Sequence, residues 1–374
     1  MRGLDRDGFV STIERWLLAV LENCADLSIE QVAVPDGGGY SAETTLIDVR
    51  CVEDGKPRRR ELVLRRQIEG SDLFLNSDLG WQWNVMKAMA GRDGVPVPVL
   101  VALERDRSLL GAPFYVMERM PGRTVPQRPN YNLSGWLADL APHDRARVWR
   151  NNVEAIARVH NVNWRDGFEF LSRDGQGAPG LDQYLRHVED WHRWAAAGRE
   201  LPVLDAAVDW LRRNRPADSP VSVLWGDPIP ANTLFAENLD VAGLIDWEMA
   251  ALGPGEIDLA WFLMFDDFFS VGMNVPRLSG LPAREEIIAI YEAEAGHPVR
   301  ELDYYEMLAI TRLAIIMVRG FDRQVGLGNI TSRSKALTHN PTMAMLAHRL
   351  GLPVPEVGAD FAELVAAAGK QERK

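Results

Sequence analysis

The chain has 374 residues, of which 47% are hydrophobic and 25% are charged, and its formal net charge is −12. This length allows two lobes with separate cores, and the composition is ordinary for a globular enzyme. Broad binding to nucleic acids or anionic membranes requires a basic surface, which an acidic chain lacks. We therefore expect neither a nucleic acid nor a membrane among its partners.

Two cysteines, Cys24 and Cys51, occur in the whole sequence. We expect neither a disulfide framework nor a cysteine-based metal site from them, and a reducing compartment fits. Charged residues interrupt every apolar run near the N-terminus, and no run of about 18 apolar residues is present. We therefore expect no signal peptide, no membrane span and a cytoplasmic location.

The first 120 residues predict a small sheet with one or two helices. Residues 9–23 carry apolar side chains at helical spacing, which predicts an amphipathic helix. Two β-type runs flank Asp54-Gly55, a typical hairpin turn, and the basic residues 56–60 are expected at its solvated end. Further along we expect a helix over 80–92 and strands over 95–106 and 113–120.

After Pro121-Gly122 the pattern becomes mostly helical, with two short apolar strands predicted within 221–227 and 241–247. The sequence therefore predicts an α+β fold with a small β-rich N-terminal lobe over 1–120 and a larger α-rich C-terminal lobe over 121–374. Clefts between lobes are preferred ligand sites, so we expect a binding site there.

Three polar residues, Asp227, Asn232 and Asp246, lie in an otherwise apolar stretch, VLWGDPIPANTLFAENLDVAGLIDWE. Acidic and amide groups are costly to bury without a partner, and a divalent metal would serve all three. We expect the two apolar strands to pair as a hairpin, which would bring the three groups together. Such a set suits phosphoryl transfer, in which one carboxylate accepts a proton and amide and carboxylate oxygens hold Mg²⁺.

Each of these three residues also has a structural interpretation. Gly-Asp-Pro forms turns, an asparagine caps turns through its side chain, and Asp246 could pair with an arginine at the edge of a sheet. Taken singly, the two interpretations are about equally good. The combination of all three at this spacing, after a β-rich segment, favours the metal site.

The same stretch resembles a known family. Gly-Asp, four residues, Asn and then about thirteen residues to Ile-Asp resembles the signature of the aminoglycoside phosphotransferase-like kinases, which are relatives of the protein kinases. LWGDPIPANTLF and LIDWEMAALGPGEIDLAW are most similar to its actinobacterial and acyl-CoA-dehydrogenase-associated branch. The resemblance covers about residues 30–265 and implies a bilobal, protein-kinase-like fold.

The resemblance implies a role for each matching residue of the second lobe. Asp227 is expected to be the catalytic base, and Asn232 and Asp246 are expected to be Mg²⁺ ligands. Asp258, in GEIDLAW, is expected to anchor the catalytic loop, and His160, in ARVHNV, is expected to be structural.

A further match implies a phosphate-binding loop in the first lobe. DGGGYSAET resembles the loop over the nucleotide phosphates, which makes Gly39, Tyr40 and Ser41 candidate contacts through backbone N–H groups and a hydroxyl. Arg65 stands where protein kinases keep a strand lysine. The alternatives are a plain glycine turn and a surface arginine on a strand.

PFYVMERM resembles the hinge that faces the adenine. Backbone groups of Glu118 and Met120 would contact the base, and Met117 would limit the depth of its pocket. ATP is the expected nucleotide, and GTP stays open because hinge side chains carry little information.

The sequence departs from the family pattern at two positions. Trp225 stands where many relatives have a histidine, and we expect it to hold the loop by packing. Gln82 stands where many relatives have a glutamate, and a neutral amide cannot form a full ion pair with Arg65. Asp78 is the alternative acidic partner.

The expected acceptor is a hydroxyl group of a small molecule, bound around residues 181–200 and 260–325. We interpret the aromatic residues there mainly as core, and Asp266-Asp267 as an exposed, solvated pair. Two alternatives stay open: a catalytically weak or inactive nucleotide-binding regulator, and a protein kinase. The spacer Pro-Ile-Pro-Ala and the short segment between Asp246 and Asp258 argue against the protein kinase.

Overall fold

The computed structural model describes residues 6–35, 42–68, 73–75, 78–173, 175–217 and 220–371. Contacts within the chain divide it into two compact units. Unit 1 comprises Met1–Ala90, Val97–Met120 and Gly369–Lys374, and unit 2 comprises Gly91–Pro96 and Pro121–Ala368.

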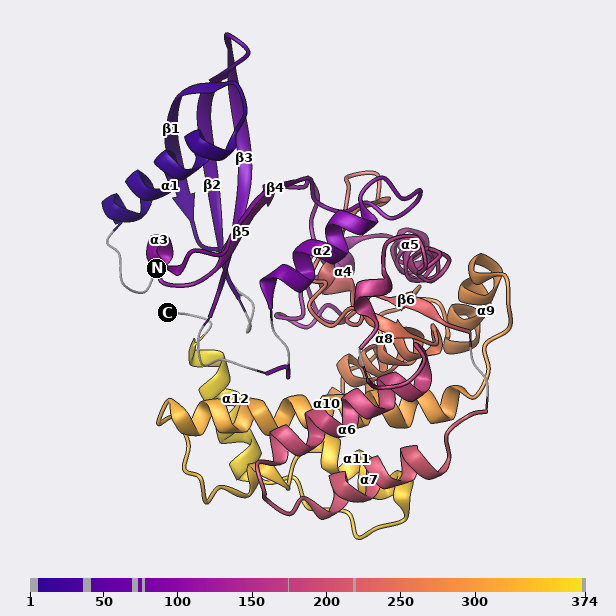
Figure 1. Ribbon diagram of the computed structural model, residues 1–374. Helices are drawn as coiled ribbons and strands as arrows, with labels where there is room; N and C mark the ends of the chain where they lie inside the picture. The colour runs from indigo at the N-terminus through magenta and orange to yellow at the C-terminus, as the bar shows by residue number, and fades with distance from the viewer. Residues whose placement is uncertain are drawn as a thin grey trace. The chain divides into compact units, whose positions relative to one another are not determined.

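Unit 1 is built on a five-stranded antiparallel sheet in the order β1-β2-β3-β5-β4 (Figure 1). The strands are β1 (Cys24–Ala33), β2 (Ala42–Glu53), β3 (Lys56–Gln67), β4 (Leu100–Glu104) and β5 (Phe114–Glu118). The helices are α1 (Arg6–Val20), α2 (Leu79–Met89) and the single turn α3 (Arg107–Leu110). The predicted hairpin at Asp54-Gly55 is confirmed, since Glu53 pairs with Lys56 across it.

Helix α1 packs against the sheet through the apolar positions that predicted it. Phe9, Ile13, Trp16 and Leu17 are buried in one cluster with apolar residues of β2, β3 and β5. The Trp16 ring meets the Phe114 ring edge to face at 4.8 Å. Helix α1 therefore depends on this shared core rather than on its own propensity, as expected for a helix of 15 residues.

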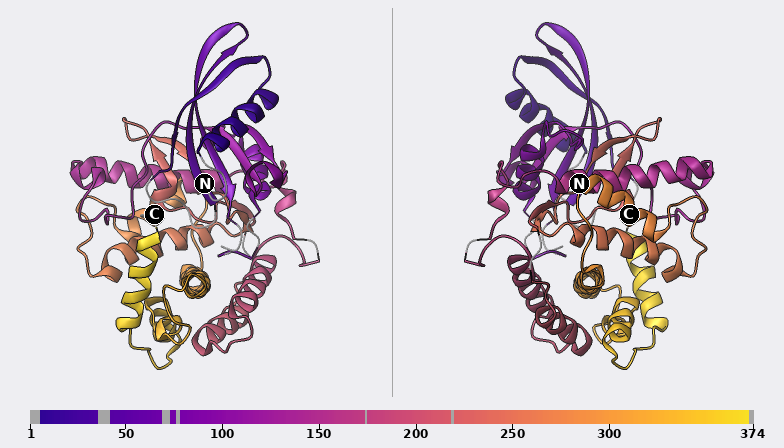
Figure 2. Two further views of the ribbon diagram at one scale, coloured as in Figure 1. Left: turned by 90° about the vertical axis from the view of Figure 1, so that its left-hand side faces the viewer. Right: turned by 90° about the vertical axis from the view of Figure 1, so that its right-hand side faces the viewer.

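Unit 2 is mostly helical. Its longer helices are α5 (Pro142–His160), α6 (Leu181–Ala196), α7 (Pro202–Arg213), α8 (Glu256–Phe269), α9 (Arg284–Ala295), α10 (Leu302–Gly326), α11 (Pro341–Leu350) and α12 (Ala359–Gln371). Short turns are α4 (Trp136–Asp139), η1 (Glu169–Leu171), η2 (Pro230–Asn232), η3 (Val271–Met273) and η4 (Lys335–Leu337). Helix α10 packs against α6, α7, α8 and α11, and Figure 2 shows it nearly end-on.

The short strands of unit 2 pair differently from the predicted hairpin. Strand β6 (Ser222–Leu224) pairs with β9 (Ala251–Gly253), while β7 (Thr233–Phe235) pairs with β8 (Val241–Leu244). The prediction that 221–227 pairs with 241–247 is therefore wrong. The turn η2 and a previously unrecognised strand β7 intervene, and β8 is closer in sequence to β7 than to β6.

No helix among the described residues is long and apolar enough to cross a membrane.

The packing of α1 gives a first test. Ile13 is fully buried, so Ile13→Ala removes apolar contacts and leaves a cavity in the core of unit 1. We expect a loss of about 2–5 kcal/mol in unfolding free energy, measured by chemical denaturation. Leu18 lies on the same helix but is 40% exposed, so Leu18→Ala should cost much less. Equal losses in the two variants would contradict this packing.

Candidate active site

The structure brings together the three polar residues that the sequence singled out. Asp227 follows β6, Asn232 ends the turn η2, and Asp246 lies two residues after β8. Ile245 links these segments through its backbone: its N–H donates to the Asn232 carbonyl at 3.0 Å, and its carbonyl accepts from Trp225 Nε1 at 2.9 Å. This pair of bonds, rather than the predicted hairpin, holds the loops side by side.

Two neighbouring side chains donate hydrogen bonds to the Asp227 carboxylate. Trp261 Nε1 of α8 lies 2.6 Å from Oδ1, and Asn232 Nδ2 lies 2.8 Å from Oδ2. Asn232 Nδ2 also donates to the Asp227 backbone carbonyl at 3.0 Å. The carboxylate is therefore fixed in orientation before any ligand arrives.

Burial raises the pKa of Asp227 from its ordinary 3.8 to about 6. The hydrogen bonds from Trp261 and Asn232 and the positive charge of Arg312 act in the opposite direction, while the negative charge of Asp246 adds to the increase. The effect of Asp246 shows that the two carboxylates are close enough to repel each other. A cation between them would relieve this repulsion.

The donor atoms around Asn232 and Asp246 fit a hard divalent cation. Because the Asn232 amide nitrogen is directed at Asp227, its amide oxygen is left for another partner. Oxygen ligands from an amide and a carboxylate are those that Mg²⁺ prefers. Asp246 adopts a left-handed backbone with φ of 63°, a conformation that is uncommon for non-glycine residues and that clusters at functional sites.

Asp258 anchors the loop that carries Asp227, as the sequence predicted. Its buried carboxylate accepts from the backbone N–H groups of Trp225 at 2.7 Å and Gly226 at 3.1 Å. His160 Nε2 of α5 lies 3.1 Å from the same carboxylate, and its Nδ1 lies 2.7 Å from the Tyr291 hydroxyl. His160 is thus buried and fully hydrogen-bonded, which agrees with the predicted structural role.

Trp225 also has a structural role. Its side chain is fully buried, packs 5.6 Å from the Trp247 ring and donates to Ile245. A histidine at this position is therefore not needed to hold the loop, and the prediction that Trp225 acts by packing is confirmed.

Sequence reasoning missed the contribution of Arg312. This residue of α10 is fully buried, donates through Nη2 to the Gly226 carbonyl at 2.7 Å and lies 4.3 Å from the Trp261 ring centroid. It therefore contacts both the peptide before Asp227 and the indole that orients Asp227. The one available signal was a single charge inside the apolar run ITRLAIIMV.

The predicted nucleotide contacts belong to unit 1, and Gly39, Tyr40 and Ser41 lie outside the described residues. Arg65 is nearly buried on β3, where it pairs in register with Tyr115 of β5. The Tyr115 hydroxyl donates to Gln82 Oε1 at 3.2 Å. Asp78, the alternative acidic partner, instead caps α2 by accepting from the Gly80 N–H at 2.8 Å.

The segment that was expected to be the hinge includes β5. Met117 is buried and pairs with Val63, and the Glu118 N–H donates to the Val99 carbonyl at 2.8 Å. The Glu118 N–H is thus already bonded within the sheet. Met120 follows the end of β5.

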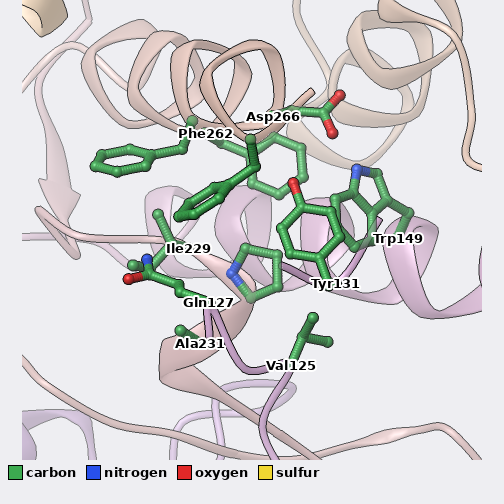
Figure 3. Close-up of a pocket in the computed structure, with 11 residues that line it drawn as sticks. Val125, Gln127, Tyr131, Trp149, Ile229, Ala231, Phe262 and Asp266 are labelled. Carbon is green, nitrogen blue, oxygen red and sulfur yellow. The ribbon is translucent and has the colours of Figure 1, made fainter. Parts of the chain in front are cut away.

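The expected acceptor segments are largely core, with one correction. Asp266 is not an exposed partner of Asp267: it is 6% exposed and accepts from Arg277 Nε at 3.0 Å. Asp266 lines a pocket whose wall contains five aromatic side chains among its eleven residues (Figure 3). The pocket is lined by Val125, Gln127, Tyr131, Trp149, Ile229, Pro230, Ala231, Phe262, Phe265, Asp266 and Phe269.

The position of this pocket explains the apolar spacer of the catalytic loop. Ile229, Pro230 and Ala231, the residues between Asp227 and Asn232, form part of its wall. Their burial against the aromatic residues of α8 and α5 fixes the separation of the two polar residues.

Asp227, Asn232 and Asp246 thus lie together on neighbouring loops of unit 2. The sequence model of the phosphotransferase enzyme family matches residues 39–301, which is more than half of the chain. The chain therefore belongs to the phosphotransferase enzyme family.

Individual relatives agree with this assignment. Acyl-CoA dehydrogenase family member 10 from Mus musculus is 27% identical over 315 residues, which are 81% of this chain and 27% of that protein. The chain thus spans about a quarter of the length of this curated relative.

Two solved structures share the α+β, protein-kinase-like fold. A candidate aminoglycoside phosphotransferase from Ralstonia eutropha JMP134 has a TM-score of 0.62 at 21% identity, with coverage of 96% of this chain and 98% of that chain. A thermostable mutant of aminoglycoside phosphotransferase APH(4)-Ia, in a ternary complex with AMP-PNP and hygromycin B, has a TM-score of 0.52 at 15% identity, with coverage of 96% and 99%.

The backbone before Asp227 gives a second test. Gly226 has φ of 91°, and a Cβ there would lie 2.2 Å from the Met249 carbonyl oxygen. Gly226→Ala must therefore displace backbone, and we expect a lower midpoint of thermal unfolding and a loss of nucleotide-dependent stabilisation. Gly198 has a similar φ of 80° with no atom within 4 Å, so Gly198→Ala should cost only about 1 kcal/mol. Similar losses in both variants would contradict the close contact.

The raised pKa of Asp227 gives a third test, on protein freed of metal with a chelator. Its pKa in the folded chain is above its unfolded value, so ionisation of Asp227 destabilises the fold as pH rises from about 4 to 6. The rise of the Asp227 pKa from 3.8 to about 6 corresponds to a loss of about 3 kcal/mol in unfolding free energy, and this loss is nearly complete above pH 6. Asp227→Asn should therefore gain stability relative to wild type across this window, as measured by denaturation at each pH. The exposed Asp209→Asn should show no such trend, and a flat difference for Asp227→Asn would refute the prediction.

Proposed function

We propose that this protein is an ATP- and Mg²⁺-dependent phosphotransferase that transfers the γ-phosphoryl group to a hydroxyl of a small molecule. The observation that carries the proposal is the half-buried Asp227, whose carboxylate is oriented by Trp261 and Asn232 and which lies beside Asp246. Membership of the phosphotransferase enzyme family supports the reaction class. The related fold of APH(4)-Ia, in complex with a nucleotide analogue and hygromycin B, supports a nucleotide and a small molecule as ligands.

Asp227 is the proposed general base. Its raised pKa makes it a better proton acceptor than an ordinary carboxylate, because catalytic pKa values near the working pH favour proton transfer. Trp261 and Asn232 hold the carboxylate still, so that it can receive the proton of an acceptor hydroxyl as that oxygen attacks phosphorus. The bond from phosphorus to the leaving oxygen of ADP breaks in the same step.

Asn232 and Asp246 are the proposed ligands of Mg²⁺. The cation, when bound, supplies positive charge that offsets the charge of the nucleotide phosphates. Arg65, Met117, Glu118 and Met120 are proposed nucleotide contacts, together with Gly39, Tyr40 and Ser41. ATP and GTP both suit such a set, and the experiment below distinguishes them.

A nucleotide-binding regulator with little turnover is the second candidate. Trp225 and Gln82 raised this possibility, because the family pattern that the sequence resembles often has a histidine and a glutamate at these positions. The hydrogen bond from Trp225 to Ile245 gives the tryptophan a structural reason to be there and weakens the argument. Gln82 retains a buried hydrogen bond with Tyr115, so its position is also satisfied without a charge.

The role of Asp227 predicts a separation of turnover from nucleotide binding. Asp227→Asn retains similar shape but loses the base, so turnover on an acceptor found by ADP release should fall by about 100- to 10,000-fold. Binding of Mg²⁺ and ATP should persist. The exposed Asp209→Asn is the matched control and should retain full turnover. Near wild-type turnover in Asp227→Asn would show that another group is the base.

The proposed metal ligands predict a loss of Mg²⁺-dependent nucleotide binding when they are replaced. In thermal unfolding with ATP or GTP, Mg²⁺ should raise the unfolding midpoint of the wild-type protein. A ligand at a hundred times its dissociation constant adds about 2.7 kcal/mol to the free energy of unfolding. Asn232→Ala and Asp246→Ala should lose the Mg²⁺-dependent part. A midpoint that no nucleotide moves would overturn the proposal, and nucleotide binding without turnover on any acceptor would favour the regulator.

A further inference from the structure

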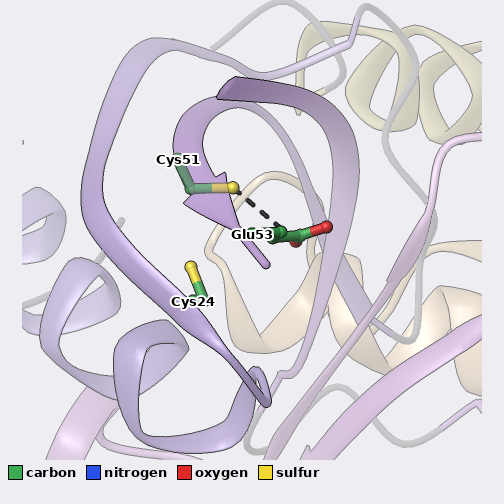
Figure 4. A group of neighbouring side chains, drawn as sticks. All are labelled: Cys24, Cys51 and Glu53. Atoms are coloured by element: carbon green, nitrogen blue, oxygen red, sulfur yellow. Dashed lines mark hydrogen bonds between the residues drawn. The ribbon is translucent and has the colours of Figure 1, made fainter. Parts of the chain in front are cut away.

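The only two cysteines of the chain, Cys24 and Cys51, lie side by side in unit 1, although they are 27 positions apart in the sequence. Cys24 begins β1 and is paired in register with Glu53 on β2. Cys51 lies two residues before Glu53, so the two β2 side chains share one face of the sheet. The two sulfur atoms and a Glu53 carboxylate oxygen all lie within 4.8 Å of one another (Figure 4).

We propose that Cys24, Cys51 and Glu53 form a binding site for a thiophilic divalent cation of the Zn²⁺ class. Two sulfur ligands and one carboxylate oxygen are a donor set that Zn²⁺ accepts and that Mg²⁺, which prefers oxygen, does not. The site is therefore distinct in chemistry from the proposed Mg²⁺ ligands Asn232 and Asp246. The proposal departs from the expectation that the two cysteines form no metal site, because a carboxylate supplies the third ligand.

The hydrogen bonds of Glu53 favour such a site. Its Oε1 accepts from Arg60 Nε at 2.5 Å and lies 3.6 Å from Cys51 Sγ, which orients the carboxylate toward the thiol. Within the described part of the chain, Oε2 accepts no hydrogen bond, so this oxygen can bind a cation while Arg60 holds the other. Arg60 also bonds Glu118, and this second contact fixes the supporting arginine.

The two thiols differ in burial, which leaves a path by which a cation can reach them. Cys51 is buried and Cys24 is half-buried, so a cation can enter from the Cys24 side and retain water at a fourth position. Binding forms two metal–sulfur bonds and one metal–oxygen bond, and the two thiol protons pass to the solvent. Burial, with Cys24 and Glu53 nearby, raises the pKa of Cys51 to about 12, and a bound cation would offset this cost of the thiolate.

The position of the site suggests what the cation would stabilise. The register of β1 and β2 is interrupted between Ala25 and Ser28, where Asp26 has φ of 49°. Cys24 is the first residue of β1, before this irregularity, and Cys51 and Glu53 lie opposite it on β2. A cation there would join the two strands where their backbone ladder is disrupted, at the end of the β1–β2 ribbon away from Ala33 and Ala42.

The test is a titration of the fully reduced chain with Co²⁺, which reports its ligands by absorption. The background is the Asn232→Ala, Asp246→Ala double variant, which removes the proposed oxygen site. We expect one equivalent of Co²⁺ to give a near-ultraviolet thiolate charge-transfer band and the strong visible bands of tetrahedral cobalt. One equivalent of Zn²⁺ should abolish both and should raise the thermal midpoint.

Three variants assign the ligands. Cys24→Ser and Cys51→Ser should each weaken the charge-transfer band and lower the affinity, and their far-ultraviolet circular dichroism should match that of the parent. Glu53→Gln should reduce Co²⁺ affinity by about tenfold or more. Glu61→Gln, at an exposed carboxylate of the adjacent strand β3, should leave it unchanged.

Several outcomes would overturn the proposal. Absence of a thiolate band in the reduced parent would do so, as would a band that survives unchanged in Cys24→Ser or in Glu53→Gln. A Zn²⁺-dependent midpoint shift that persists when both cysteines are serine would assign the cation to another site. None of these measurements depends on phosphotransfer, so their failure is separate from a failure of the proposed function.

Discussion

The buried carboxylate of Asp258 is the interaction on which the arrangement of the active site depends. An ionised carboxylate inside a protein costs several kcal/mol unless donors surround it. Here two backbone N–H groups of the catalytic loop and one imidazole nitrogen supply them. Because the loop follows β6, His160 ends α5 and Asp258 belongs to α8, one side chain fixes the start of the loop relative to two helices.

Asp227 follows directly after Trp225 and Gly226, which Asp258 holds, but its own carboxylate is less completely paired. It receives two side-chain donors, but it remains next to Asp246, and burial keeps its pKa high. Native structures usually pair buried charges more completely than this. In the proposed function this incomplete pairing has a use, because a fully neutralised carboxylate would have little affinity for a proton.

Local sequence patterns predicted much of the fold. The helical spacing of Phe9, Ile13 and Trp16 predicted α1 because the buried stripe of a helix repeats every three or four residues. Asp54-Gly55 predicted the β2–β3 hairpin because few sequences fit so tight a turn. Strand β1 was missed, since its bulges break the alternation of buried and exposed residues. The pairing of β6 with β9 was also missed, because strand partners depend on contacts far apart in sequence.

The candidate site also contains residues that the sequence predicted and residues that only the structure identified. The polar residues Asp227, Asn232 and Asp246 could be predicted because an apolar stretch makes them conspicuous and their spacing matches a known pattern. Trp261 and Arg312 could be recognised as parts of the site only from the structure, since they lie on α8 and α10 and act through space.

Arg312 shows why this second group matters. Its guanidinium carries one hydrogen bond to the Gly226 carbonyl and lies against the Trp261 ring, while Nε and Nη1 have no hydrogen-bond partner within the described residues. A buried cation is stabilised by nearby negative charge and by aromatic faces, and Asp227 and Trp261 provide these two. The cation in turn lowers the cost of ionising Asp227. Asp227, the indole that orients it and the buried arginine therefore stabilise one another, and no short segment of sequence contains all three.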